Sequence, residues 1–208
     1  NKIIYLTFDD GPGKYTQGLL DLLDKYNVKV TFFVTNTHPD YQNLIAEEAK
    51  RGHTVAIHSA SHKYNQIYTS EQAFFDDLEQ MNSIIKAQTG NDASIIRFPG
   101  GSSNTVSKDY CPGIMTQLVN DVTARGLLYC DWNVSSGDAN NKPISTEQVV
   151  QNVISGVQSH NVSVVLQHDI KDFSVNAVEQ IIQWGQANGY TFLPLTTSSP
   201  MSHHRVNN

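Results

Sequence analysis

Two adjacent carboxylates, Asp9 and Asp10, stand in the stretch TFDDG, between the apolar run IIYL and the pair Gly-Pro. Aspartate, glycine and proline all favour turns, so this stretch could be an ordinary turn. Side chains alternate along a strand, however, so two neighbouring aspartates near a strand end would point in different directions. In that arrangement one carboxylate can bind a metal ion while the other acts on a reacting atom.

Two histidines, His58 and His62, stand four residues apart in the stretch HSASH. If this stretch is helical, both imidazoles lie on one face about a turn apart, where they can bind one metal ion. The other interpretation is a solvated turn. Two histidines and one aspartate leave coordination positions open, as a catalytic zinc ion requires. The stretch lacks the glutamate of an HExxH motif, so a catalytic base must come from elsewhere.

The stretch RFPGG places Arg97 at the end of an apolar run and Gly100 three residues later. A buried arginine at a strand end needs a carboxylate partner. Glycines allow the backbone to approach a ligand closely. The alternative is a surface arginine before a tight turn.

His168 follows the apolar run VSVVLQ, and a single histidine in that position could be a satisfied core residue or a catalyst. Asp131 or Asp138 could orient its imidazole. Trp132 could belong to the core or stack on a sugar, as aromatic residues at a barrel mouth do. The other histidines are expected at helix ends or in a solvated tail: His38, His53, His160, His203 and His204.

Seven apolar runs predict β-strands, at residues 3–7, 28–34, 53–57, 93–98, 126–132, 163–167 and 190–195. Their near-continuous hydrophobicity is typical of strands that are covered on both faces, as in parallel sheets.

Amphipathic stretches between these runs predict helices. Two of them begin with the spacing of a capping box, Thr69 with Gln72 and Ser145 with Gln148. The tail from Thr196 onward is expected to be irregular.

Strands that alternate with helices imply an α/β fold with a parallel sheet. The candidate polar groups follow five different strands. In a doubly wound sheet ligands gather at one switch point, whereas in a β/α barrel the carboxyl ends of all strands converge on one site. We therefore expect a distorted (β/α)7 barrel, similar to a TIM barrel but with seven units, and a single domain over residues 1–208.

The composition excludes some classes of function. The net charge of −6 and the lack of a basic stripe argue against nucleic acid or an anionic membrane as the main partner. No stretch approaches the roughly 18 apolar residues of a membrane span, and we do not expect residues 1–208 to include a signal peptide. The chain opens directly in a strand, so we expect a domain cut from a longer protein. Cys111 and Cys130 could form one disulfide or be two buried thiols, and neither stands in a CxxC motif.

Taken in order, the stretches TFDDG, HSASH, RFPGG, WNVSSGD and LQHD resemble carbohydrate esterase family 4, the polysaccharide deacetylases with a NodB homology domain. The resemblance covers nearly the whole chain. Each motif alone is modest, but the ordered set is specific, and it implies the NodB type of barrel.

The resemblance implies a role for each candidate residue. Asp10, His58 and His62 match the metal ligands of the family, which usually bind zinc and in some members cobalt, manganese or nickel. Asp9 matches the catalytic base, and Arg97 matches the residue that holds this base in place.

Four further positions match the rest of the site. His168 matches the general acid, and Asp138 matches the carboxylate that tunes it. The backbone N–H of Gly100 matches the oxyanion donor, and Trp132 is a candidate for contact with the substrate.

The chain also departs from the family pattern. RFPGG stands where many members have RPPYG, so an aromatic residue near the oxyanion site is missing. WNVSSGDA stands where many have WxVDSxDW: Ser135 replaces an aspartate, and Ala139 replaces a tryptophan that often forms one wall of the acetyl pocket. The SSGDA text is similar to a branch that includes many peptidoglycan deacetylases of Gram-positive bacteria.

The resemblance implies a metal-dependent hydrolase that removes acetyl groups from N-acetylglucosamine units of peptidoglycan or chitin-type chains. The alternatives are an acetylxylan esterase, which uses the same residues, and an inactive glycan-binding module, which the presence of both Asp9 and His168 disfavours. Because such polysaccharides are too large for the cytoplasm, we expect an extracellular or surface-anchored bacterial enzyme, monomeric within a larger protein.

Overall fold

The fold is built on a parallel sheet of eight strands. The computed structural model describes all residues, 1–208. Neighbouring strands follow the order β5-β4-β3-β2-β1-β7-β6, and β8 pairs separately with β1. The strands are β1 (Ile3–Asp9), β2 (Thr31–Thr35), β3 (Thr54–Ser59), β4 (Ile95–Ile96), β5 (Leu128–Tyr129), β6 (Val134–Ser135), β7 (Val162–His168) and β8 (Thr191–Phe192).

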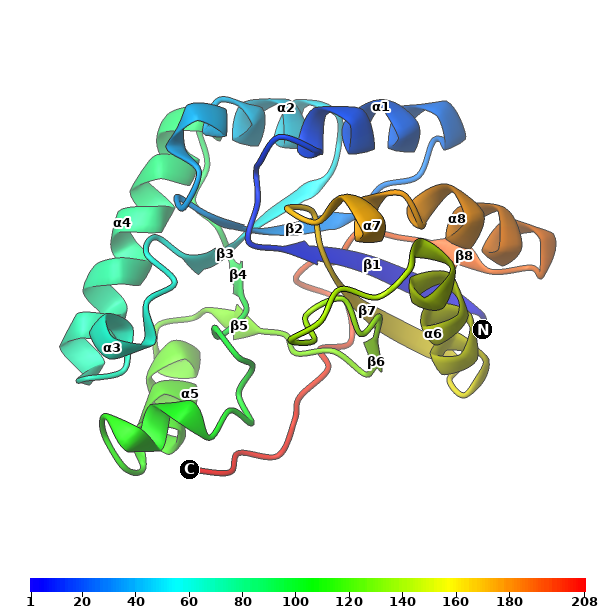
Figure 1. Cartoon of the computed structure of the whole chain (residues 1–208). Helices are drawn as coiled ribbons and strands as arrows, with labels where there is room; N and C mark the ends of the chain where they lie inside the picture. The colour runs from blue at the N-terminus through cyan, green and yellow to red at the C-terminus, as the bar shows by residue number, and fades with distance from the viewer.

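Helices cover the outer face of this curved sheet (Figure 1). They are α1 (Thr16–Tyr26), α2 (Leu44–Lys50), α3 (Tyr64–Ile67), α4 (Glu71–Thr89), α5 (Ile114–Ala124), α6 (Thr146–Gln158), α7 (Asp172–Val175) and α8 (Val178–Ala187), with short 3-10 turns η1 (Pro39–Tyr41) and η2 (Val106–Asp109). None of these helices has the length and apolar character to cross a bilayer.

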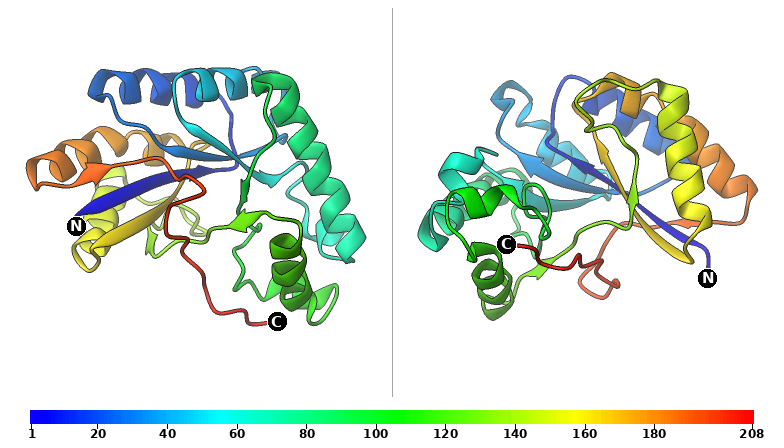
Figure 2. Two further views of the ribbon diagram at one scale, coloured as in Figure 1. Left: turned by 180° about the vertical axis from the view of Figure 1, so that it is seen from behind. Right: turned by 60° about the horizontal axis from the view of Figure 1, so that its bottom comes forward.

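The expected distorted (β/α)7 barrel is confirmed, and it is open on one side. Strands β1 to β7 form a continuous parallel path, but no strand pair joins its two ends, β5 and β6. The segment 196–208 lies at this opening instead, where the Asp131 N–H donates to the Ser202 carbonyl at 2.7 Å. Figure 2 shows this segment, in red, running close to β5.

The apolar strands are buried on both faces, as predicted. In β1, the side chains of Ile4, Leu6 and Phe8 belong to the large core of 38 residues shared with the helices. Tyr5 points the other way, into a cluster of seven residues to which most of the strands contribute one side chain each. Because side chains alternate, Thr7 and Asp9 share the inner face with Tyr5. The sheet thus turns polar on its inner face toward the carboxyl ends of the strands.

Several local predictions need correction. The HSASH stretch is not helical: His58 lies in β3, and His62 lies in the following turn with φ 53°. The cap of α4 is Ser70, whose hydroxyl accepts from the Ala73 N–H, so the prediction of Thr69 was one residue early. The cap at Ser145 is confirmed by its bond from the Gln148 N–H.

The sheet also differs in detail from the predicted strands. The run 93–98 contributes only the two residues of β4, and the run 126–132 only those of β5. The short strand β6 was not predicted. Cys111 and Cys130 are both free thiols, and Cys130 is buried in the inner cluster.

Candidate metal and catalytic site

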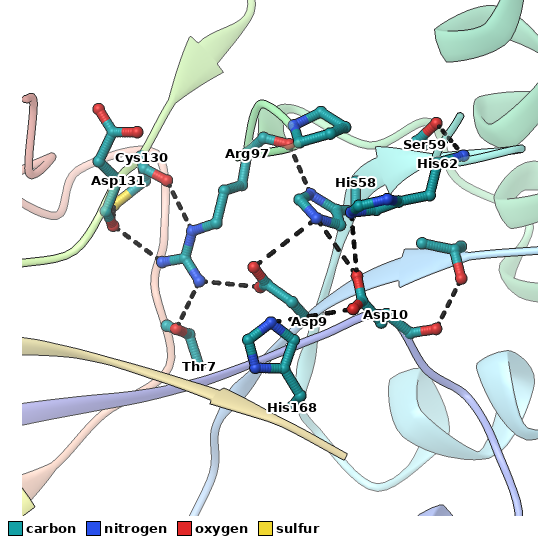
Figure 3. A network of polar contacts seen from close by, with 12 residues as sticks. Thr7, Asp9, Asp10, His58, Ser59, His62, Arg97, Cys130, Asp131 and His168 are labelled. Carbon is teal, nitrogen blue, oxygen red and sulfur yellow. Dashed lines mark hydrogen bonds and ion pairs between the residues drawn. The ribbon is translucent and has the colours of Figure 1, made fainter. Parts of the chain in front are cut away.

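A cavity of about 320 Å³ lies at the carboxyl ends of the strands. It collects side chains from segments far apart in the sequence, several of which Figure 3 shows pointing toward one another. Its lining residues are Asp9, Asp10, His58, His62, Tyr64, Gly100, Trp132, Ala139, Leu166 and His168.

The three predicted metal ligands come together in this cavity. The Asp10 Oδ1 atom lies 3.4 Å from the Nε2 atoms of both His58 and His62. One ligand atom from each residue lies within 4.8 Å of the others. Asp10 follows β1 with φ 78°, a left-handed backbone conformation that is uncommon for residues other than glycine. Both aspartate carboxylates approach His58 Nε2, at 3.4 Å for Asp10 and 3.7 Å for Asp9.

A hydrogen bond fixes which nitrogen of His58 faces the cavity. The Nδ1 atom lies 2.7 Å from the Arg97 carbonyl oxygen, which can only accept, so Nδ1 carries the proton. The Nε2 lone pair is then free to bind a cation, an arrangement common among metal-binding histidines. Burial lowers the pKa of His58, although the neighbouring Asp9 acts in the opposite direction. The neutral form that binds metal is thus favoured.

The turn that carries His62 is held by Asp77 of α4, which the sequence analysis did not identify. Its carboxylate accepts the N–H groups of Ala60 at 3.0 Å and Ser61 at 2.9 Å, and the hydroxyl of Ser59. Ser59 in turn accepts the His62 N–H at 2.9 Å. Asp77 thereby sets the path of the chain between the two histidines.

Asp9 is fixed by a fully buried Arg97. The Arg97 Nη1 group donates to Asp9 Oδ1 at 2.9 Å and to the Thr7 hydroxyl at 2.7 Å. The other guanidinium donors reach the carbonyls of Cys130 at 2.9 Å and Asp131 at 2.8 Å. Each of the three guanidinium nitrogens thus donates to at least one acceptor. The other oxygen of Asp9, Oδ2, lies 3.7 Å from His58 Nε2.

His168 is oriented by Asp138, the second of the two aspartates that the sequence offered. The Asp138 Oδ1 atom accepts from His168 Nδ1 at 2.8 Å, and its Oδ2 atom accepts the His168 N–H at 2.7 Å. Burial lowers the pKa of His168, but the hydrogen bond and charge of Asp138 outweigh it and raise the pKa to about 9. His168 is therefore protonated at neutral pH, and its Nε2 atom lies 3.8 Å from Asp10 Oδ2.

Gly100 and Trp132 also line the cavity. Gly100 has φ 79°, a conformation that favours glycine, and its N–H donates to no backbone oxygen. This N–H is free to bind a ligand. Trp132 is half-buried, and its ring lies against Gly101 so closely that a Cβ at that position would be 2.8 Å from it.

Two further cavity residues bear on the departures from the family pattern. Ala139 lines the cavity but is too small to form a wall there. Tyr64 of α3, which the sequence analysis missed, places its hydroxyl 3.3 Å from where a Cβ at Gly100 would be. An aromatic side chain from another element thus fills the space beside this glycine.

Asp131 does not orient His168. It is fully buried, and its carboxylate accepts the N–H and hydroxyl of Ser102 and the N–H of His204. The expectation of a solvated His204 is therefore wrong: this side chain is half-buried against Trp132. His203, although exposed, stacks on Tyr129 with a centroid distance of 3.8 Å. The segment 196–208 has no helical or strand periodicity, so its sequence could not indicate that these two histidines pack against Tyr129 and Trp132.

The residues present fit a divalent cation. The Asp10 Oδ1 atom is buried and has no hydrogen-bond partner, which is costly unless a positive group binds it. Burial raises the pKa of Asp10, but the surrounding His58, His168 and His62 outweigh it and lower the pKa, so the carboxylate is ionised. Two imidazole nitrogens and one carboxylate oxygen are ligands typical of catalytic zinc, with further positions left open.

Comparison with known proteins gives relatives for the whole chain. The family model described as polysaccharide deacetylase matches residues 1–111. A peptidoglycan-N-acetylglucosamine deacetylase of Bacillus cereus is 33% identical over 196 residues, which are 92% of this chain and 68% of the relative. A bifunctional xylanase/deacetylase of Pseudobutyrivibrio xylanivorans is 31% identical over 199 residues, 94% of this chain and 30% of the relative. The chain thus spans about two thirds of the length of the first of these curated relatives and under a third of the length of the second.

Solved structures are also similar. The crystal structure of the catalytic domain of a peptidoglycan N-acetylglucosamine deacetylase from Eubacterium rectale has 98% sequence identity and a TM-score of 1.00, and the match covers 100% of this chain and 94% of that one. A polysaccharide deacetylase from Bacillus cereus has 32% identity and a TM-score of 0.83, covering 100% and 97%.

Proposed function

The chain belongs to the polysaccharide deacetylase family. We propose that it removes the acetyl group from N-acetylglucosamine units of peptidoglycan, in a metal-dependent reaction that releases acetate. Chitin-type chains are a related substrate in this proposal. The observation that carries this proposal is the position of Asp9 beside both the triad of metal ligands and the protonated His168. A base and an acid thus flank one cavity. The printed names of the Bacillus cereus and Eubacterium rectale relatives support the choice of substrate.

Asp10, His58 and His62 would hold the cation. We propose zinc as the metal, because two imidazoles and one carboxylate suit it, while cobalt, manganese or nickel can occupy such a donor set. When bound, the metal supplies a Lewis acid that acidifies water and polarises the acetyl carbonyl.

Asp9 is the base in this proposal. Its carboxylate lines the cavity and is tethered by Arg97, so it is placed to take a proton from the water that attacks the acetyl carbon. The Nη1 group of Arg97 that holds Asp9 also donates to the Thr7 hydroxyl, which gives the guanidinium a second fixed partner beside the carboxylate. The two adjacent aspartates are tolerated because the Arg97 guanidinium, the protonated His168 and, when bound, the divalent cation would offset their charges.

Gly100 and His168 act on the other atoms of the acetyl group. The free N–H of Gly100 binds the carbonyl oxygen as negative charge develops there, and loss of a single such donor costs on the order of 10²–10³ in rate in other enzymes. Protonated His168 then donates from Nε2 to the departing nitrogen, while Asp138 keeps Nδ1 in place. An amine is a poor leaving group unless it is protonated, so His168 matters most for an N-acetyl substrate.

Two alternatives differ in substrate or class. Removal of O-acetyl groups from xylan would use the same residues, and the xylanase/deacetylase relative favours it as the second candidate. An inactive glycan-binding module would not need the ordered bonds that hold Asp9 and His168. The substrate is the point on which the two enzymatic candidates differ.

The cellular setting is part of the proposal. Because peptidoglycan lies outside the membrane, we propose that the protein acts extracellularly or anchored at the bacterial surface. The curated relatives extend beyond the matched region, which supports residues 1–208 as the catalytic domain of a larger protein. We propose that this domain acts as a monomer, because its site is completed by one chain.

Acetate release decides between these candidates. The zinc-loaded protein is incubated in parallel with peptidoglycan, chitooligosaccharides and acetylxylan, with and without a chelator. We expect chelator-sensitive release that is fastest on peptidoglycan. Faster release from acetylxylan supports the esterase, and no release from any polymer supports the binding module.

A further inference from the structure

The segment 196–208 has no regular secondary structure, yet it is bound tightly where the barrel is open. It crosses the stretch 130–133 that connects β5 to β6. The Asp131 N–H donates to the Ser202 carbonyl at 2.7 Å, and the His204 N–H donates back to Asp131 Oδ2 at 2.9 Å. The first bond joins two backbones, and the second ends on the Asp131 side chain. The segment is thus fastened to Asp131 through both the backbone and the carboxylate of that residue.

The side chain of His204 reaches two parts of the active-site wall. Its Nε2 atom lies 2.6 Å from the Trp132 carbonyl oxygen, and its Nδ1 atom lies 2.9 Å from the Ser103 hydroxyl. A carbonyl can only accept, so Nε2 carries the proton and Nδ1 accepts from Ser103. The imidazole also packs edge to face on the Trp132 indole, with a centroid distance of 4.6 Å. One neutral tautomer satisfies every contact.

Both contacts of His204 lead to residues that line the cavity. Trp132 lines it directly, and Ser103 lies three residues after Gly100, which also lines it. The buried carboxylate of Asp131 ties the same loop to the segment, because it accepts from Ser102 as well as from His204. Asp131 and His204 together therefore connect the loop 100–103 and Trp132 to the C-terminal segment.

We propose that the C-terminal segment is a positioning element of the active site, and that His204 is the residue that sets Trp132 and the loop from Gly100 to Ser103 for glycan binding. His204 does not line the cavity; it acts through the residues that do. Trp132 is half-buried, and the small Ala139 offers no side chain that could pack against it. The orientation of Trp132 therefore depends on the contacts that His204 makes with its carbonyl and its ring. The activity part of this inference rests on the proposed function.

The test is the variant His204→Ala in a Trp184→Phe background, in which Trp132 is the single tryptophan. We expect a changed emission maximum and greater acrylamide quenching of Trp132, measured on metal-free protein. On the zinc-loaded protein we expect a KM for N-acetylglucosamine oligomers raised about tenfold, the equivalent of one weak contact. The kcat and the zinc affinity should change much less, because Asp9, His168 and the metal ligands are untouched.

His160→Ala is the matched control, since the side chain of this exposed histidine bonds only the Gly156 carbonyl of the preceding helix α6. His204→Gln, whose amide can still donate to the Trp132 carbonyl, should recover part of the affinity. If His204→Ala fails to fold, Ser103→Ala removes only the hydroxyl and should move both readouts in the same direction by a smaller amount.

Wild-type fluorescence and wild-type KM in both His204→Ala and Ser103→Ala would overturn the inference. So would a loss confined to thermal stability, which shows a structural role alone. If the wild-type protein releases no acetate, the proposed function fails, while the fluorescence of Trp132 still decides whether His204 positions it.

Discussion

Asp9 and His168 are register partners on the adjacent parallel strands β1 and β7. Paired residues on neighbouring strands point to the same face of a sheet, and the strands are about 4.8 Å apart. The proposed base and the proposed acid therefore stand side by side, at the last residues of their strands. Each keeps its own partner, Arg97 for Asp9 and Asp138 for His168. The pairing of β1 with β7 thus places the group that accepts a proton and the group that donates one beside the same acetyl group.

Separate removal of this base and acid should damage catalysis and spare the metal site. For Asp9→Asn and for His168→Ala we expect kcat to fall by about 10²–10⁴, the usual contribution of general acid–base groups. Zinc affinity should stay close to that of the wild type, because neither side chain is a ligand. Acetate-release kinetics and zinc titration calorimetry measure the two effects. Loss of zinc binding in step with kcat would contradict the assignment of roles.

The bond between Asp138 and His168 should set the alkaline limit of activity. The pKa of His168 is raised to about 9, so the acid form persists until the pH passes that value. In Asp138→Asn the pKa should fall back toward the ordinary value of 6.5, and the alkaline limb of the kcat/KM profile should move to lower pH. Asp172→Asn, which changes an exposed residue on α7, is the control. An alkaline limb that does not move in Asp138→Asn excludes His168 as the titrating acid.

Asp77 should support the metal site from behind. Its carboxylate accepts hydrogen bonds from the turn between His58 and His62. Loss of a residue that supports metal ligands in this way typically lowers metal affinity about 10–100-fold. We expect a loss of about that size for Asp77→Asn. The neighbouring Asp76 is exposed and bonds Gln72, so Asp76→Asn should bind zinc normally. Calorimetric zinc titration of both variants compares them directly. Equal affinities would show that the turn keeps its shape without Asp77.

A buried carboxyl away from the cavity should affect stability. Glu48 on α2 is fully buried, and neither of its oxygens has a hydrogen-bond partner. Burial, and then the charge of Asp169, raise its pKa well above 4.5, so the folded state holds this proton to higher pH than the unfolded chain does. Stability contributed by that proton is lost as the pH rises above the unfolded value.

Glutamine cannot ionise, so Glu48→Gln should remove the loss of folding stability that accompanies rising pH in the wild type. We expect the melting temperature of the variant, relative to wild type, to rise as the pH increases above the ordinary glutamate pKa of 4.5. Glu47→Gln, which changes the surface partner of Arg51 on the same helix, should show no such trend. Thermal melts across this range provide the measurement, and a difference that is independent of pH would rule out a buried titrating Glu48.

The sequence predicted the parts of the site that lie at strand ends. Apolar runs locate strands, and the polar residues that end them must meet at one edge of a parallel sheet. Asp9, Asp10, His58, Arg97 and His168 were found in this way. The motif resemblance then selected Asp138 over Asp131, which position alone had left open.

Other features have no local signal in the sequence. The sequence left a helix and a turn open for the HSASH stretch, and the bonds to Asp77 in α4, which join residues 16 to 18 positions apart, favour the turn. The docking of His204 depends on an opening between β5 and β6 that exists only in the folded barrel. Tyr64 enters the cavity because a short helix begins two residues after His62. Such contacts arise from tertiary packing.

The central claim is that Asp10, His58 and His62 together bind one divalent cation that the reaction requires. The most direct measurement is acetate release by metal-stripped protein as zinc is added back, for wild type and for Asp10→Ala. We expect wild-type activity to be absent at first and to reach a plateau at one zinc per chain, while the variant stays inactive. Full activity of the stripped protein, or near-normal turnover by Asp10→Ala, would contradict the claim.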